Sequence, residues 1–204
     1  MLYNKCYSKG ICMPPKTKFD KEAIVEAAFA IAKEEGFAGI TARSVAKRLR
    51  SSVAPIYLNF ATIDDLIKAV VERVFALSDE LLAKQKGPDL FENIGKASLV
   101  FAREYPVFFR ELVMQQNPYV ASYETFQDAM VEALAEDENM RGLTYEERKF
   151  LLLKMRIFQT GLSVMVANGH LPSWLDDQAA EALLLEMGED LLRIQQIKQK
   201  EMGK

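Results

Sequence analysis

Apolar residues recur at the three- and four-residue spacing of an α-helix through most of this chain, which restricts the folds open to it. Residues that end helices interrupt the pattern at Gly36, Gly87-Pro88, Pro106, Asn117-Pro118, residues 139–142 and residues 168–172. A strand through residues 57–60 is the competing interpretation of one segment, but it would be isolated and without a partner. The sequence therefore predicts an all-α protein.

Composition narrows the class of protein. The chain has 204 residues, of which 50% are apolar, so it can bury a sizeable core. No uninterrupted apolar run approaches the roughly 18 residues of a membrane-spanning helix, and no signal-type block follows the N-terminus. Cys6, Cys12 and His170 are the only cysteines and histidine, which are too few for a zinc site. We expect a cytoplasmic protein with free thiols, no cofactor and no membrane contact.

Charge is distributed unevenly along the chain. The net charge is −3, yet residues 1–60 hold ten Lys and Arg against five Asp and Glu. The remainder is strongly acidic, so the two parts are expected to differ in function. A basic N-terminal part indicates contact with nucleic acid, while the alternative is that charge merely varies along a solvated surface.

The N-terminal residues precede any helical pattern. Residues 1–12 lack periodicity and are interpreted as an extension, with Met13 as a candidate alternative start. Residues 1–19 are therefore expected to form a flexible basic arm, in which Lys18 can reach DNA or remain a solvated charge.

Polar residues with capping chemistry mark the starts of four helices in residues 20–86. Asp20 is expected to cap a first helix that ends at Gly36, and Thr41 a short second helix over residues 42–49. Ser52 is expected to cap a third helix that begins at Val53. These three caps are followed by a fourth, Thr62, ahead of a long helix.

Two short helices joined by a tight turn, the second poor in charge, are typical of a helix-turn-helix. The run from Ile24 to Leu66 resembles the DNA-binding domain of TetR/AcrR-type transcriptional regulators. The resemblance lies at Ile24, Ala27, Ala28, Ile31, Gly36, Phe37, Thr41, Arg43, Val45, Ala46, Ser52, Ile56, Tyr57, Phe60 and Leu66. It implies a helix-turn-helix DNA-binding domain at residues 20–66, with the motif at 41–60, and a larger C-terminal helical domain at 67–204 for effector binding and dimerisation.

The chain departs from the family pattern beside the motif. Arg50 stands where the family usually has a glycine in the turn, and Ser51 where a small apolar residue is common. Asn59 replaces a histidine or aromatic residue, and the usual lysine after the third helix is absent. Because a non-glycine residue in a left-handed turn costs about 1 kcal/mol, Arg50 indicates a slightly different turn.

The start of the third helix is expected to face base edges in the major groove, while flanking residues bond phosphates. Ile56 and Phe60 are expected in the core instead. The predicted DNA-binding residues are Lys18, Thr41, Arg43, Lys47, Ser51, Ser52, Val53, Ala54, Pro55, Tyr57 and Asn59. Tyr57 could equally serve core packing, and Ser52 only as a cap.

The C-terminal part is rich in aromatic residues and methionines, most of which suit a core, although a subset could line an effector pocket. The predicted ligand-binding residues are Phe108, Met114, Tyr123, Phe126, Met155, Phe158 and Gln159. Residues 144–167 and 176–199 are apolar on more than one face, so each helix needs a second partner. The predicted dimer interface comprises Gly161, Leu162, Met165, Leu184, Gly188 and Leu191.

These features favour a homodimeric DNA-binding regulator, a repressor that a small-molecule effector releases from a palindromic double-stranded DNA operator. An activator of the same architecture is equally compatible with the residues. The other alternative is an all-α enzyme or small-molecule carrier that does not act on DNA. Against an enzyme, the sequence has no Ser-His-Asp set, metal-ligand cluster or phosphate loop.

Overall fold

The structure is a computed structural model that describes residues 19–118 and 123–202, apart from the side chains of residues 123–127 and 202. Within those ranges the chain is helical and contains no strand, which confirms the all-α prediction. The helices are α1 (Lys21–Glu35), η1 (Phe37–Gly39), α2 (Ala42–Arg48), α3 (Ala54–Asn59), α4 (Ile63–Ala83), α5 (Leu90–Glu104), α6 (Pro106–Phe109), η2 (Arg110–Met114), α7 (Tyr123–Ala133), η3 (Leu134–Glu136), η4 (Glu138–Met140), α8 (Tyr145–Ala167) and α9 (Asp177–Met202).

Local capping chemistry determines where the N-terminal helices begin. Asp20 accepts a hydrogen bond from the backbone N of Ala23 at 2.8 Å, and Thr41 and Thr62 form capping boxes at α2 and α4. Gly36 ends α1 with φ +84°, in the left-handed region that glycine favours. These observations confirm the predicted caps Asp20, Thr41 and Thr62 and the predicted end of α1.

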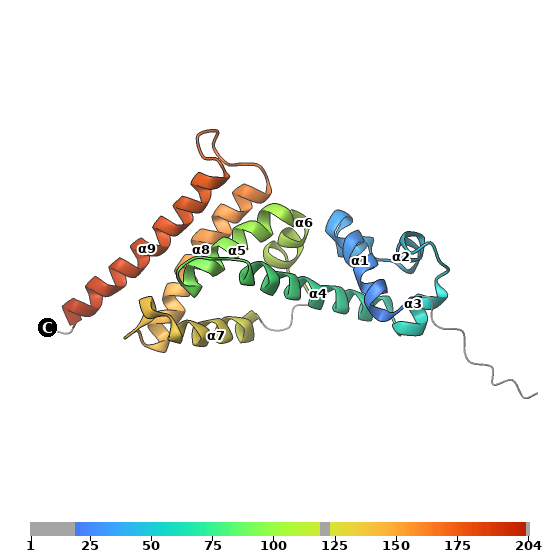
Figure 1. Cartoon of the computed structure of the whole chain (residues 1–204), viewed down its shortest axis with the longest axis horizontal. Coiled ribbons are helices and arrows are strands. Elements are labelled where there is room, and N and C mark those ends of the chain that lie inside the picture. Colours follow the sequence, from blue (N-terminus) through green and yellow to red (C-terminus); the bar gives the residue numbers. More distant parts are fainter. Residues whose placement is uncertain (1–18, 119–122, 203–204) are drawn as a thin grey trace, which may run out of the picture.

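Helices α1, α2 and α3 gather at one end of the molecule, and α4 leads from them toward the remaining helices (Figure 1). Their shared core includes Ile24, Val45, Ile56 and Leu66, all without solvent exposure. Phe60 is also buried, so the prediction that Ile56 and Phe60 belong to the core is confirmed. Burial of the inward face leaves the opposite faces of the two short helices α2 and α3 to solvent.

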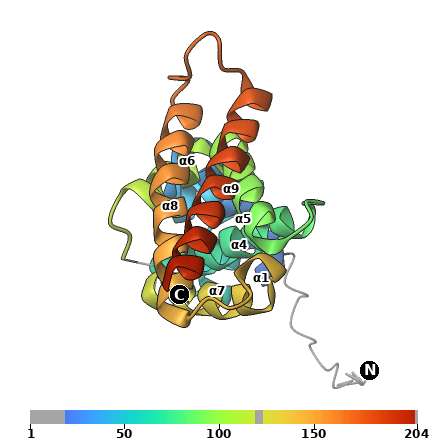
Figure 2. The ribbon, with the colours of Figure 1, turned by 90° about the vertical axis from the view of Figure 1, so that its left-hand side faces the viewer.

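The other end of the molecule is built from α5, α8 and α9, with α8 and α9 side by side (Figure 2). Among the described helices, α8 has the length and apolar content to cross a membrane, with a mean hydropathy of 1.4. Core helices of soluble proteins share those properties. Only 22% of that apolar window is buried within the chain, so α8 presents apolar surface outward.

An aromatic cluster joins the N-terminal helices to α6. Phe108, which has no solvent exposure, lies with ring centroids 5.1 Å from Phe29, 5.8 Å from Phe37 and 6.2 Å from Tyr105. Beside this cluster, the Glu111 carboxylate of η2 accepts a hydrogen bond from the backbone N of Phe37 at 2.7 Å. Packing and a charged hydrogen bond therefore connect the turn after α1 to α6 and η2.

Candidate nucleic-acid interface and cavity

Helix α2 presents a basic outer face whose start is fixed by local hydrogen bonds. The Thr41 hydroxyl accepts from the backbone N of Ser44 at 3.0 Å, and the Ser44 hydroxyl donates to the Gly39 carbonyl at 2.7 Å. Arg48 pairs with Glu34 at 3.1 Å. Arg43 and Lys47 are exposed and form no ion pair with the described residues, so both cations are available to phosphates.

Helix α3 begins one residue later than predicted. Its N-cap is Val53, which provides no side-chain cap, and Pro55 lies in the first turn. The Ser52 hydroxyl is therefore not the helix cap, a correction that follows from the helical backbone of Val53, whose carbonyl accepts from the N of Ile56. Ser52 and Ala54 are exposed and Val53 retains 39% exposure, so the segment before α3 offers short side chains to solvent.

The outer face of α3 carries Tyr57 and Leu58, which are 54% and 73% exposed. Leu58 is absent from the predicted DNA-binding residues, although its place between inward-facing Ile56 and Phe60 could have identified it. Asn59 is half-buried, and its side chain donates to the Pro55 carbonyl at 2.8 Å. Among the other predicted residues, Ser51 donates to the Ser52 carbonyl, and Lys18 lies outside the described residues.

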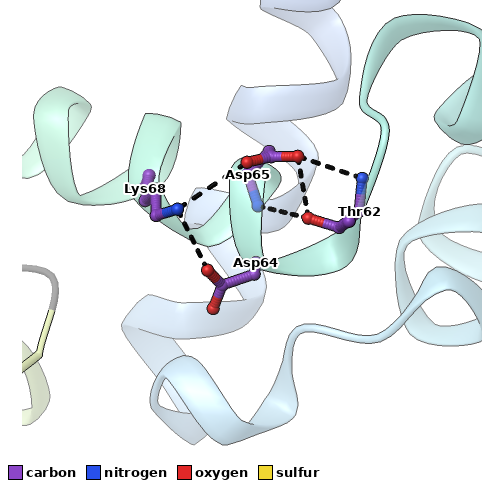
Figure 3. A network of polar contacts seen from close by, with 4 residues as sticks. All are labelled: Thr62, Asp64, Asp65 and Lys68. Carbon is purple, nitrogen blue, oxygen red and sulfur yellow. Dashed lines mark hydrogen bonds and ion pairs between the residues drawn. The ribbon is translucent and has the colours of Figure 1, made fainter.

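The first turn of α4, the helix that follows α3, carries the carboxylates of Asp64 and Asp65 (Figure 3). The backbone N of Thr62 donates to Asp65 at 3.1 Å, and the N of Asp65 donates to the Thr62 hydroxyl at 3.1 Å. Lys68 lies 3.1 Å from Asp64 and 3.7 Å from Asp65, and its hydrogen bond to Asp64 is the main reason that its pKa is raised. The first turn of α4 thus carries carboxylates, and the positions just before them, where the family pattern has a lysine, hold Ala61, Thr62 and Ile63.

The turn between α2 and α3 contains a residue in the left-handed conformation, and that residue is Arg50 and not a glycine. Arg50 has φ +52°, the one positive φ of a non-glycine residue in the described chain. The N of Arg50 donates to the Lys47 carbonyl at 3.1 Å, and the N of Ser51 donates to the Ala46 carbonyl at 2.9 Å. This is the Schellman arrangement, in which glycine normally holds the position of Arg50. The expectation of a different turn is wrong, because Arg50 adopts the glycine conformation.

Arg50→Gly should therefore stabilise the protein. Relief of the left-handed strain should raise the free energy of unfolding by about 0.5 to 1 kcal/mol, after part of the gain is lost to the freer unfolded chain. Urea unfolding followed by circular dichroism measures this difference. Lys47→Gly is the matched control, since it places glycine within α2 at a side chain without an ion pair among the described residues, and should instead destabilise by about 1 kcal/mol. Equal effects of the two substitutions would contradict the assignment of strain to Arg50.

A cavity of about 320 Å³ lies between the start of α5 and helices α8 and α9. Of the predicted ligand-binding residues with described side chains, only Met155 lines it. Phe108 lies in the aromatic cluster, and Met114 is 46% exposed. Phe158 packs against the core that α5, α8 and α9 share, and Gln159 follows it on α8. The side chains of Tyr123 and Phe126 lie outside the described part of the chain.

The predicted dimer-interface residues divide between two faces. Leu162 and Leu184 are 5% and 0% exposed, and Gly188 is buried against Phe91, so these residues face the core of their own chain. Their burial corrects the prediction that they face a partner. Gly161 is exposed with open space around it, and Met165 and Leu191 are partly exposed. Exposed apolar side chains on α8 and α9 are Phe150, Leu153, Ile157, Ile194 and Ile197.

Comparison with known proteins gives independent information about this arrangement. Residues 24–70 match the family model described as bacterial regulatory proteins, tetR family. No curated protein matches the chain. A TetR-like transcriptional regulator from Rhodococcus sp. RHA1 is similar in structure, with a TM-score of 0.60, 19% identity and coverage of 82% of this chain and 92% of that one.

A second solved structure, a transcriptional regulator from the same organism, has a TM-score of 0.55 and 16% identity, and covers 86% of this chain and 97% of that one. At these identities the two structures establish a shared fold. The matched segment contains α2, α3 and the start of α4, which form the surface described above. Residues 24–70 thus form a helix-turn-helix domain of the tetR family type, and the chain shares the fold of the two solved regulators.

Proposed function

We propose that the protein is a cytoplasmic, homodimeric repressor that binds a palindromic operator and is released from it by a small-molecule effector. Residues 20–66 would bind DNA, and residues 67–204 would bind the effector and the second protomer. The observation that carries the DNA-binding role is the outward face of the helix-turn-helix. There the exposed side chains Val53, Tyr57 and Leu58 lie on an element whose opposite face, Ile56 and Phe60, is buried.

The roles of these residues follow from their chemistry. Val53 and Ala54 are short apolar side chains that suit thymine methyl groups, while the Ser52 hydroxyl can donate to or accept from a base edge. Tyr57 can bond a phosphate through its hydroxyl, and Leu58 adds apolar contact at the groove. The exposed cations Arg43 and Lys47 of α2 would neutralise phosphates on the adjacent backbone.

The two-fold arrangement of the dimer is supported by the exposed apolar face of α8 and α9. Phe150, Ile157 and Ile194 are 60%, 67% and 49% exposed on the same pair of helices, and exposed apolar side chains gathered in this way indicate an interaction surface. Phe150 and Ile157 are one heptad apart on α8, so they lie on one stripe of the helix. Two copies of this face, packed across a two-fold axis, would form a four-helix bundle and place two α3 helices on one palindrome.

The DNA-binding role predicts a steep dependence of affinity on salt. Fluorescence anisotropy should detect binding of the dimer to the DNA upstream of its own gene. Replacing Arg43 and Lys47 together by Ala should reduce the slope of log affinity against log salt by about 0.9 for each lost phosphate contact. Because each dimer loses both side chains twice, the slope should fall by about 3 to 4.

A double substitution elsewhere on the chain provides the control for that experiment. Lys84 and Lys86 are exposed beyond the far end of α4, and their joint replacement by Ala removes the same charge. This variant should retain the original slope. The same reduction in both variants would mean that net charge, and not contact by α2, determines binding. An affinity independent of salt in the unmodified protein would overturn the proposed function.

A further inference from the structure

The cavity between α5, α8 and α9 has an apolar floor. Phe91 and Met155 are each 6% exposed, and Leu184 is fully buried, yet all three line the cavity. Its volume of about 320 Å³ is within the range of small-molecule sites. The floor can therefore receive the apolar body of a ligand.

Gly188 keeps one wall of the cavity at the level of the backbone. A Cβ atom at this position would lie 3.2 Å from Phe91 Cε1 and 3.8 Å from Met155 Cε. Glycine inside a helix such as α9 costs about 1 kcal/mol relative to alanine. The close approach of the Phe91 ring to this glycine accounts for its presence within one protomer, without reference to the dimer.

All of the charged residues that line the cavity are acidic: Asp89, Glu92 and Glu189. Lys96 lies 2.5 Å from Glu92 and compensates that carboxylate. Glu189 is exposed and forms no ion pair with the residues that the structure describes. The residual charge of the lining is therefore negative, and Glu189 is the carboxylate most available to a ligand.

The start of α5 also borders the cavity, and helix N-termini in general attract anions because they expose backbone N–H donors. Here two of those donors are already used by the protein. The N of Glu92 donates to Asp89 at 2.8 Å, and the N of Phe91 donates to the buried carboxylate of Asp137 at 3.3 Å. The helix start thus adds carboxylates to this end of the chain and leaves these donors unavailable to an anionic ligand.

We propose that this cavity binds an organic cation with an aromatic or branched aliphatic body, and that such a cation is the effector. The body would pack on Phe91, Met155 and Leu184, while the ammonium group would lie toward Glu189 and Asp89. The thioether of Met155 and the ring of Phe91 are polarizable surfaces that suit a cationic aromatic ligand. The role as effector, but not the binding site itself, rests on the proposed repressor function.

A matched pair of probes tests the charge preference on the full-length chain without DNA. The cation 4-tert-butylbenzylammonium and the anion 4-tert-butylbenzoate have the same body and opposite charge. Isothermal titration calorimetry should show the cation binding at least about 10-fold more tightly, since the lining attracts one and repels the other. The ¹³C-methyl NMR signal of Met155, assigned with Met155→Leu, should shift on saturation with the cation. Tighter or equal binding of the benzoate, or an unmoved Met155 signal, would overturn the assignment.

Two substitutions on α9 locate the cation. Glu189→Gln removes a lining carboxylate and should weaken cation binding by about 3- to 5-fold. Glu186→Gln removes the same charge from an exposed position of the same helix that does not line the cavity, and should leave binding within about 2-fold. Equal effects of the two variants would place the cation elsewhere and overturn the proposal.

Operator binding in the presence of the cation separates this inference from the proposed function. Saturating 4-tert-butylbenzylammonium should lower operator affinity by at least about 5-fold, the lower range of coupling between two sites. If the cation binds the cavity but operator affinity is unchanged, its role as effector is refuted while the site stands. If the chain binds no upstream DNA under any condition, the repressor function fails independently of the calorimetric result.

Discussion

Ile157→Asp should convert the proposed dimer to a monomer and reduce operator affinity by about 10³-fold. Ile157 is 67% exposed on the outer face of α8, between Phe150 on one side and the open space beside Gly161 on the other. In a two-fold interface each substitution occurs twice, so two carboxylates would be placed in the apolar interface. Burial of unpaired charge is among the most destabilising changes known in interfaces. A monomer reads only half of a palindrome, and specific binding then approaches the non-specific level.

Analytical ultracentrifugation measures the monomer fraction of this variant, and anisotropy on the upstream DNA measures its affinity. Val113→Asp is the control, because Val113 is also an exposed apolar residue, 44% exposed, but lies in η2 instead of α8 or α9. It should remain dimeric and bind DNA as before. A dimeric Ile157→Asp protein with full affinity would show that the exposed face of α8 is not the interface.

The sequence predicts the N-terminal helices well because their boundaries depend on local chemistry. Asp20, Thr41 and Thr62 each bond a backbone N–H three residues later, an interaction that needs no tertiary contact. Ser52 does not cap α3, because the turn before this helix places Val53 at the N-cap position and α3 begins at Ala54. That turn is closed by the left-handed conformation of Arg50, which capping chemistry alone does not reveal.

The C-terminal part is harder to predict because its sites depend on how long helices face each other. Apolar residues on two faces of α8 and α9 indicate that each helix packs against its own core and against something else. They do not indicate which of the two faces meets the core of the same chain. Leu184 and Gly188 are thus assigned to the wrong side, whereas α9 directs both toward α5. The cavity likewise joins Phe91, Met155 and Leu184, which are far apart in sequence and distinguished by no motif.

Phe108→Ala should have the largest effect on stability, lowering the free energy of unfolding by about 3 to 5 kcal/mol. Phe108 has no exposure and contacts rings from α1, η1 and the residue before α6, so truncation leaves a cavity bordered by three elements. The residues around Phe108 also pack against other parts of the N-terminal core, which limits how far they can move into the space. Urea unfolding at fixed protein concentration measures the loss, and the concentration is held constant because a dimer's stability depends on it.

Phe75→Ala deletes the same ring from α4 at a position that is 42% exposed, and should cost less than about 1 kcal/mol. The comparison tests the contact between α6 and the turn after α1. Phe108 of α6 packs against Phe37, and Glu111 of the next element, η2, accepts a hydrogen bond from the backbone N of Phe37. Loss of Phe108 should therefore loosen the turn that precedes α2, and operator affinity should fall at temperatures where the variant is still folded. A Phe108→Ala protein as stable as Phe75→Ala would mean that this aromatic cluster does not connect α6 to the DNA-binding helices.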